Sequence, residues 1–360
     1  MALDRITLAD FRNHGRSELS GTAKFNLLTG ENGAGKTNVL EALSLFAPGR
    51  GLRRAQLADL PRGNGAGGFA VGASLLAAET EPVRLGTLVR ADRPGRRLVQ
   101  VNGAEASAAS LGEWLAVSWL TPAMDRLFAD SAGNRRRFVD RMALALDPGH
   151  ARNATRYEAA LRERNRLLTG DAPPDPAWLD GVERHLAEYG SALSQSRARA
   201  IAAVAGALAA LPDEPFARPA LAYAAGGATT QGDLAAALRD GRRRDRQAGR
   251  TLTGPHRDDL EVTMAGKGAP AATCSTGEQK AMLIAITLAH AELAAQGRPG
   301  LLLLDEVAAH LDPLRREALF ARLRTGGAQV WLTGTERAPF ADIAGEAAMW
   351  EVSGGEVVAE

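Results

Sequence analysis

The chain has 360 residues, of which 45% are hydrophobic and 24% charged, enough for about two or three packed units with their own cores. A net charge of +1 does not indicate a nucleic-acid partner, so any DNA binding must come from local basic patches. The single cysteine, Cys274, excludes an intrachain disulfide. With no signal peptide and no apolar run of ~18 residues for a membrane span, the sequence favours a cytoplasmic protein.

The first predicted elements are strands at residues 3–11 and 25–29. The second strand leads into a stretch that fits the P-loop pattern G-x-x-x-x-G-K-[ST], and apolar residues at helical spacing follow up to Phe46. Such glycines let N–H groups turn toward phosphates, while the lysine, here one of four in the chain, reaches the outer phosphates and the threonine hydroxyl binds Mg²⁺. The alternative is a glycine-rich turn that binds nothing. We predict a site for ATP or GTP, with Mg²⁺, at Gly30, Glu31, Asn32, Gly33, Ala34, Gly35, Lys36 and Thr37.

Residues 68–101 have a strand-like pattern. Three alternating segments at 69–75, 83–89 and 97–101 are separated by turns, and Asn102-Gly103 is a strong hairpin signal. This pattern predicts an antiparallel sheet beside the nucleotide core. Residues 114–120 are predicted to form one more buried strand, which Thr121-Pro122 closes.

The sequence pattern changes near residue 123, where it becomes helical and rich in alanine and arginine. Helices are expected at 135–146, 151–168, 178–211 and 234–247, and they are too often interrupted for a long coiled coil. Three arginine runs stand out, one of them spread over Arg162, Arg164 and Arg166. Each run fits either the solvated face of a helix or a surface for the DNA backbone. The candidates for DNA binding are Arg135, Arg136, Arg137, Arg242, Arg243 and Arg244.

Two further patterns lie near the C-terminal end. Four leucines ending at Leu304 predict a buried strand that delivers two acids, Asp305 to hold Mg²⁺ and Glu306 to orient and deprotonate the attacking water. A helix from about Lys280 is preceded by S-T-G-E-Q, which is either a capping box or a phosphate-binding signature. Its candidate residues are Ser275, Gly277, Glu278 and Gln279. The segment His310-Leu311-Asp312-Pro313 opens another helix, and residues 329–335 form a further core strand.

In this order, the P-loop, the S-x-G-E-Q signature, the L-L-L-L-D-E strand and the L-D loop resemble the ABC ATPase heads of SMC-like DNA-repair proteins. Residues 10–13, 121–125, 135–138 and 254–260 resemble the RecF family of bacterial recombination mediators more specifically. The resemblance covers essentially the whole chain. It implies an α/β fold: an ABC-type P-loop ATPase head with an antiparallel β subdomain and a helical insertion domain. The head would comprise residues 1–122 and 251–360, and the insertion residues 123–250.

The resemblance also implies a function. Members of this family form a head-to-head homodimer on ATP, in which the signature residues face the γ-phosphate bound by the partner, and Asp312 lies in the D-loop. They bind duplex DNA next to single-strand gaps and act with RecR and RecO in DNA repair, replication restart and the SOS response. Two departures from ABC ATPases are a missing glutamine loop and the absence of a histidine after the strand that ends near Thr333. Thr333 or Thr335 is a weak substitute, which suggests a slow ATPase used as a switch.

Two alternatives come from other classes. An ABC subunit of a transporter, or of another assembly without DNA, would have a coupling surface for membrane helices and no arginine-rich insertion. A translation or repair ABC protein with two heads in one chain is contradicted by the single P-loop.

Overall fold

The computed structural model describes residues 3–76, 81–170, 172, 174–211, 215–295, 297–308 and 311–360, so His310 at the predicted helix start lies outside the described residues. The chain forms two compact units. The first consists of residues 1–125, 214–216 and 283–360, and the second of residues 126–213 and 217–282. The prediction that the chain divides into the segments 1–122, 123–250 and 251–360 stays a proposal.

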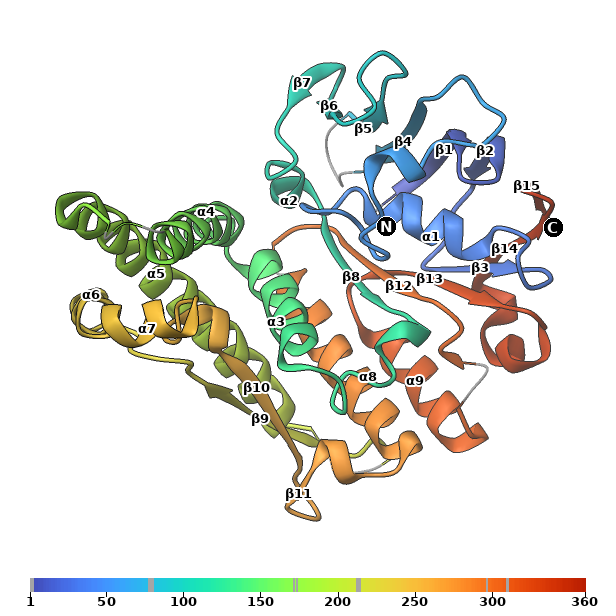
Figure 1. Ribbon diagram of the computed structural model, residues 1–360. Helices are drawn as coiled ribbons and strands as arrows, with labels where there is room; N and C mark the ends of the chain where they lie inside the picture. Colours follow the sequence, from blue (N-terminus) through green and yellow to red (C-terminus); the bar gives the residue numbers. More distant parts are fainter. Residues whose placement is uncertain are drawn as a thin grey trace. The chain divides into compact units, whose positions relative to one another are not determined.

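The first unit contains a six-stranded, mostly parallel sheet (Figure 1). Its strand order is β15-β14-β3-β13-β12-β8, and only the β14–β15 pair is antiparallel among the described strands. All residues of β3, β8 and β12 are buried, as expected of parallel strands covered on both faces. The strands are β3 (Phe25–Thr29), β8 (Ala116–Leu120), β12 (Gly300–Leu304), β13 (Gln329–Gly334), β14 (Ala347–Ser353) and β15 (Glu356–Ala359).

A second six-stranded sheet in this unit is antiparallel, with the order β2-β1-β4-β5-β6-β7. Strands β4 and β5 alternate buried and more exposed residues, and Asn102 and Gly103 form the β6–β7 turn with φ values of 52° and 84°. The antiparallel sheet and the hairpin predicted from the sequence are therefore confirmed. The strands are β1 (Leu3–Phe11), β2 (His14–Ser20), β4 (Phe69–Leu75), β5 (Val83–Val89), β6 (Arg97–Val101) and β7 (Ala104–Ala106).

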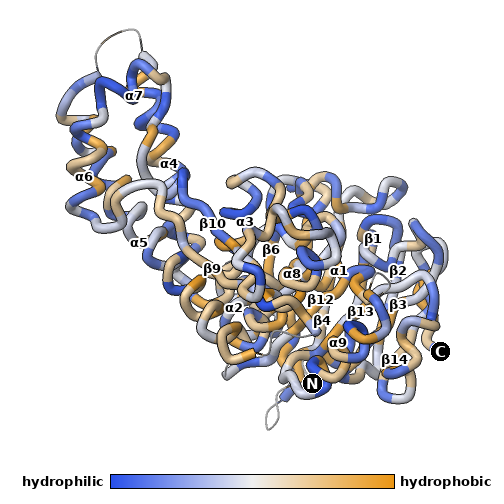
Figure 2. The backbone as a smooth tube through the Cα atoms, turned by 90° about the horizontal axis from the view of Figure 1, so that it is seen from below, coloured by the Kyte–Doolittle hydropathy of each residue, from blue (hydrophilic) through white to orange (hydrophobic). Residues whose placement is uncertain are grey.

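One apolar core joins the two sheets of the first unit. Helix α1 contributes Val39, Leu40 and Leu43 to a cluster that also includes Leu303 of β12 and Trp331 of β13. Figure 2 shows that hydrophobic residues are concentrated around β12 and β13. The helices of this unit are α1 (Lys36–Ser44), α2 (Leu111–Trp114), α9 (Pro313–Thr325) and the C-terminal part of α8 (Thr276–Ala294), which begins in the second unit. Trp114, predicted to begin a strand, belongs instead to the short helix α2.

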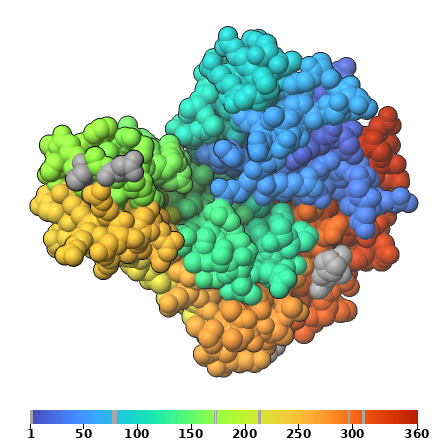
Figure 3. All heavy atoms as spheres, viewed as in Figure 1, coloured from blue at the N-terminus to red at the C-terminus, as the bar shows by residue number. Residues whose placement is uncertain are grey.

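The second unit is mainly helical. Its helices are α3 (Ala132–Leu146), α4 (His150–Thr169), α5 (Pro176–Ala209), α6 (Gln231–Asp240) and α7 (Arg242–Ala248). In Figure 3 the yellow atoms of α6 and α7 lie against the green atoms of α4 and α5. The single helix predicted at 234–247 is divided at Gly241 into two helices, although Gly241 keeps helical dihedral angles and donates to the Ala237 carbonyl at 3.0 Å. The unit also holds a three-stranded sheet that the sequence pattern only partly predicted: β9 (Pro219–Ala224), β10 (Asp259–Met264) and β11 (Ala269–Pro270).

Arg164 lies inside the second unit and not on its surface. Its side chain is fully buried and contacts Glu183 at 3.0 Å, Asp245 at 2.7 Å and the Thr251 hydroxyl at 2.8 Å. A buried guanidinium must satisfy its donors within the protein, and here it joins α4, α5 and α7. The run Arg162, Arg164 and Arg166 is thus not one continuous solvated or DNA-facing surface. No helix among the residues that the structure describes is long and apolar enough to cross a membrane.

Candidate nucleotide-binding site

The predicted P-loop connects strand β3 to helix α1, as the sequence indicated. Three of its glycines have positive φ: 147° at Gly30, 83° at Gly33 and 123° at Gly35. A Cβ atom at Gly30 would lie 2.2 Å from the carbonyl oxygen of Val352. One at Gly35 would lie 2.8 Å from the side chains of Asn13 and His14. Both the backbone conformation and the space at these positions require glycine.

The N-terminus of α1 suits an anion. The helix begins at Lys36, and its N-cap residue, Gly35, has no side chain that could cap the first N–H groups. The first backbone N–H groups of a helix have no partner within the helix and carry its positive end. A phosphate group therefore fits this position chemically.

Lys36 folds back over the loop. Its Nζ atom donates to the carbonyl oxygens of Gly30 at 2.6 Å and Glu31 at 2.8 Å, and the residue is only 4% exposed. Burial lowers the pKa of the ammonium from its ordinary value, while the charges of Glu306 and Asp305 act in the opposite direction. The cation is thus held at the loop, next to the position where outer phosphates would bind.

Thr37 and Asp305 meet although they come from distant parts of the sequence. The Thr37 hydroxyl donates to Oδ1 of Asp305 at 2.9 Å. Asp305 follows β12, and its backbone N–H donates to the carbonyl of Leu120 in the neighbouring β8 at 2.9 Å. The carboxyl ends of parallel strands thereby bring together two hard oxygen ligands of the kind that Mg²⁺ prefers.

Glu306 has an unusual backbone conformation next to Asp305. Its φ of 53° is left-handed, and its side chain is half-buried. Such a conformation is uncommon for a residue other than glycine and occurs often at functional sites. The Thr333 hydroxyl donates to Asp305 at 2.9 Å and accepts the Glu306 N–H at 2.9 Å, whereas Thr335 is exposed.

Residues outside the motif hold the P-loop from behind. The Asn13 side chain donates to the Ala34 carbonyl at 2.8 Å, and Nε2 of His14 lies 3.1 Å from the Gly35 carbonyl oxygen. The backbone N–H of Gly355 also donates to Ala34 at 3.0 Å. The sequence assigned no role to Asn13 and His14. The signal was present, since Asn13 belongs to the D-F-R-N stretch that carries the family resemblance.

The signature segment forms a capping box at the start of α8. The Ser275 hydroxyl donates to Oε2 of Glu278 at 3.0 Å, and the Ser275 N–H donates to the same oxygen at 2.9 Å. The contact with Lys267 and, to a lesser extent, the hydrogen bonds from Ser275 lower the pKa of Glu278 to about 2. The Gln279 amide donates to the Cys274 carbonyl at 2.9 Å.

This arrangement does not exclude the signature function. Ser275 and Gly277 are exposed, so the first turn of α8 is accessible to a ligand outside this chain. The roles of Ser275, Gly277, Glu278 and Gln279 toward a nucleotide stay predictions, as does that of Asp312. In the structure Asp312 caps α9, since its side chain accepts the N–H of Arg315 at 2.9 Å.

The arginine candidates for DNA binding differ in how far they are engaged. Arg135 forms a two-bond ion pair with Asp259, at 2.7 and 2.6 Å, and Arg136 donates to the Asp258 carbonyl at 2.7 Å. The ion pair raises the pKa of Arg135 and lowers that of Asp259. Arg242 pairs with Glu183, on α5. The remaining three are exposed: Arg137, Arg243 and Arg244.

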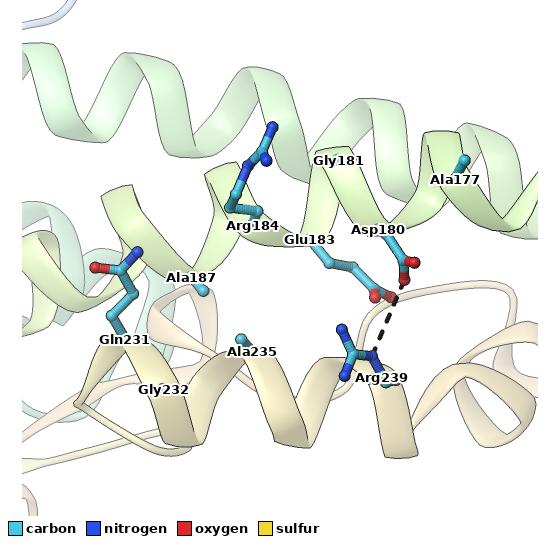
Figure 4. A pocket seen from close by; sticks show the side chains of 10 residues that line it. All are labelled: Ala177, Asp180, Gly181, Glu183, Arg184, Ala187, Gln231, Gly232, Ala235 and Arg239. Atoms are coloured by element: carbon cyan, nitrogen blue, oxygen red, sulfur yellow. Dashed lines mark ion pairs between the residues drawn. The ribbon is translucent and has the colours of Figure 1, made fainter.

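A hollow of about 710 Å³ lies on the surface between α5 and α6 (Figure 4). An ion pair of 4.0 Å between Asp180 and Arg239 spans one end. Its lining, as far as the structure describes it, includes none of the predicted nucleotide or signature residues, so it is separate from the site above.

Sequence comparison places this architecture among known proteins. The family model for the RecF/RecN/SMC N-terminal domain matches residues 2–349. The DNA replication and repair protein RecF of Brucella suis biovar 1 (strain 1330) is 46% identical over 369 residues, covering 99% of this chain and 96% of the relative. The protein of the same name from Mesorhizobium japonicum is 45% identical over 376 residues, covering 99% and 97%.

Structural comparison gives the fold. The structure of the recombination mediator protein RecF-ATP in the RecFOR pathway aligns with a TM-score of 0.88 at 22% identity, covering 100% of this chain and 97% of that one. An Smc head bound to the C-winged helix domain of ScpA aligns with a TM-score of 0.57 at 16% identity, covering 100% and 98%. The predicted fold class, an ABC-type ATPase head with parallel and antiparallel sheets, is confirmed.

Proposed function

The chain belongs to the RecF family of DNA replication and repair proteins, and on that premise we propose that it is an ATP-dependent, DNA-binding recombination mediator. The alternative of a transporter subunit is not favoured, because the relatives that match 99% of this chain are named as replication and repair proteins.

The observation that carries the ATPase part of the proposal is the contact between Thr37 and Asp305 at 2.9 Å. It joins the end of the P-loop to the acid that follows strand β12. The N-terminus of helix α1 and the buried Lys36 lie beside this contact. Thr37 and Asp305 would hold Mg²⁺ through their oxygen atoms, and the ion would supply positive charge to neutralise the phosphates of ATP.

The residues of the chain then have distinct roles in hydrolysis. Lys36 and the first N–H groups of α1 hold the phosphates of ATP, and Glu306 orients the attacking water and accepts its proton. No histidine follows Thr333 in the sequence, so one stabilising contact typical of ABC ATPases is missing. Slow hydrolysis suits a switch that reports the nucleotide state.

The exposed first turn of α8 supports a dimer that closes on ATP. Ser275 and Gly277 would face the γ-phosphate held by a second copy of the chain, where a helix N-terminus favours negative charge. The homodimer would bind duplex DNA beside single-strand gaps, with RecR and RecO as partners in the cytoplasm. The exposed arginines of the second unit would contact phosphates.

Light scattering and DNA binding test this function together. The wild-type protein with ATP and Mg²⁺ is expected to show the mass of two chains, and with ADP the mass of one. A gapped duplex should bind the ATP-loaded form more tightly than a blunt duplex, with an affinity that falls as salt rises. A mass that does not respond to ATP, or equal binding of the gapped and blunt duplexes, would contradict the proposal.

A further inference from the structure

The hydroxyl of Thr333 connects the two acidic residues of the candidate site. It lies 2.9 Å from Oδ1 of Asp305 and 2.9 Å from the backbone nitrogen of Glu306. A backbone N–H can only donate and a carboxylate can only accept, so the hydroxyl accepts from Glu306 and gives its single proton to Asp305. Thr333 is fully buried and Asp305 is 6% exposed, so the bond between them is protected from water.

The order of the strands explains why Thr333 reaches both residues. Strand β13 lies between β3, which leads into the P-loop, and β12, which leads into the acids. Leu332 of β13 pairs with Leu304 of β12, and Thr333 pairs with Leu28 of β3. The Thr333 side chain is therefore at the carboxyl edge of the sheet, between the two loops of the site.

The bond to Glu306 holds a strained part of the backbone. A left-handed conformation is unfavourable for a residue with a Cβ atom, so it persists only where the surroundings fix it. At Glu306, with its φ of 53°, the Thr333 oxygen accepts the N–H at the bend. Within the described part of the chain, two hydroxyls donate to Oδ1 of Asp305, those of Thr333 and Thr37.

We propose that Thr333 is a positioning residue for ATP hydrolysis, which holds Asp305 and Glu306 in their working arrangement through one hydroxyl group. The inference rests on the proposed ATPase function and deepens it. Because the only proton of the hydroxyl points to Asp305, Thr333 has no donor for a phosphate oxygen. It therefore does not replace the missing histidine, and Thr335 remains the candidate for that role.

Three variants test the proposal. Thr333→Val keeps the shape of the side chain and removes the hydroxyl, and Thr333→Ser keeps the hydroxyl and removes a methyl group. Thr287→Val is the matched control, because the buried Thr287 hydroxyl donates only within α8, to the Leu283 carbonyl at 2.8 Å. The measurements are single-turnover hydrolysis over a range of Mg²⁺ concentrations, affinity for a fluorescent ATP analogue without Mg²⁺, and thermal unfolding.

Thr333→Val is expected to hydrolyse ATP about 10- to 100-fold more slowly, since small displacements of catalytic groups have effects of this size. Its Mg²⁺ requirement should rise, while its affinity for the ATP analogue without Mg²⁺ should match wild type. Thr333→Ser should turn over close to the wild-type rate. Thr287→Val should lose stability only.

A Thr333→Val variant with wild-type turnover and wild-type Mg²⁺ dependence would overturn the proposal. Thr333 would then have only a structural role in the core. If Thr333→Val does not fold, Thr333→Cys replaces it, since a thiol is a weak donor of similar size. Unimpaired hydrolysis in Thr333→Cys would contradict the proposal equally. A wild-type protein that neither binds nor hydrolyses ATP would instead refute the proposed function itself.

Discussion

Thr37 and Asp305 are separated by 268 positions in the sequence, and the hydroxyl of the first donates to the carboxylate of the second at 2.9 Å. This bond brings the predicted phosphate-binding loop and the acid proposed to hold Mg²⁺ to one edge of the parallel sheet. The Thr333 hydroxyl donates to the same carboxylate oxygen, and next to Asp305 is Glu306 in its left-handed conformation. Together these residues form one constellation that suits phosphoryl transfer from ATP to water.

Replacing Lys36 by methionine should abolish ATP binding or weaken it severely. The variant keeps the length of the side chain and loses the charge that would bind the outer phosphates. Lys24→Met is a suitable control, because Lys24 lies before β3 and donates to carbonyls near the end of α9, including that of Gly326 at 2.6 Å. Titration with a fluorescent ATP analogue measures both. Wild-type affinity in Lys36→Met would refute the P-loop assignment.

Glu306→Gln should bind ATP and Mg²⁺ but not turn over. The amide keeps the shape of the side chain and can hold a water molecule, but it cannot accept the proton of that water. The variant should accumulate as an ATP-bound dimer in light scattering, whereas Glu351→Gln, an exposed change on β14, should behave like wild type. A monomer in the presence of ATP, or unchanged hydrolysis, would overturn the role given to Glu306.

Neutralising the exposed arginines should weaken DNA binding and reduce its salt dependence. Changing Arg137, Arg243 and Arg244 to alanine should leave ATP affinity nearly intact and lower the log–log salt slope on duplex DNA by roughly 0.9 for each lost phosphate contact. Fluorescence anisotropy over a salt series measures the slope. An identical slope would mean that these side chains are only a solvated surface.

Arg135→Ala serves as a contrast to the variants of the exposed arginines, because the main effect expected of it is on stability. Because Arg135 is bonded twice to Asp259, its removal should cost about 1.5–3 kcal/mol of stability.

Acid should destabilise the protein before its carboxylates are protonated. Burial lowers the pKa of both His14 and His256, so below about pH 6.5 the unfolded chain binds more protons than the folded one. The free energy of unfolding should therefore fall as the pH decreases through this range, by at most about 1.4 kcal/mol per pH unit for each histidine. Denaturant titrations from pH 7.5 to 5.5 measure the slope, which should be smaller in His14→Gln. A free energy of unfolding that rises as the pH is lowered from 7.5 to 5.5 would contradict the lowered pKa values of the two histidines.

Local motifs could be predicted from the sequence, whereas contacts between distant segments could not. The P-loop and the Asp305-Glu306 pair are contiguous patterns, because one strand and the turn after it are enough to define each of them. The part played by Thr333 depends on β13 lying between β3 and β12, and strand order is not encoded at any one position.

The arginines illustrate the same limit. Arg164 and Arg135 looked like members of exposed basic runs, but the acids that bind them, such as Asp245 and Asp259, come from far along the chain. Strand β9 went unpredicted because its sequence, P-A-L-A-Y-A, has a weak pattern and depends on pairing with β10.

The central claim is that two chains share each ATP, with the P-loop of one facing the signature of the other. Ser275→Arg tests this claim, because a guanidinium at the start of α8 should block closure sterically while leaving the P-loop untouched. Alone, the variant should bind ATP as a monomer and lose most hydrolysis. If Ser275 were only an N-cap, the change should cost about 1 kcal/mol of stability and leave ATP-driven assembly unaffected.

The decisive measurement is ATP hydrolysis in a mixture of Ser275→Arg and Lys36→Met, each inactive alone. A mixed dimer contains one intact composite site, formed by the P-loop of the first chain and the signature of the second. We predict that the mixture recovers part of the wild-type activity, in proportion to the mixed dimer formed. A mixture as inactive as its components, or a Ser275→Arg variant that dimerises and turns over normally, would contradict the shared site.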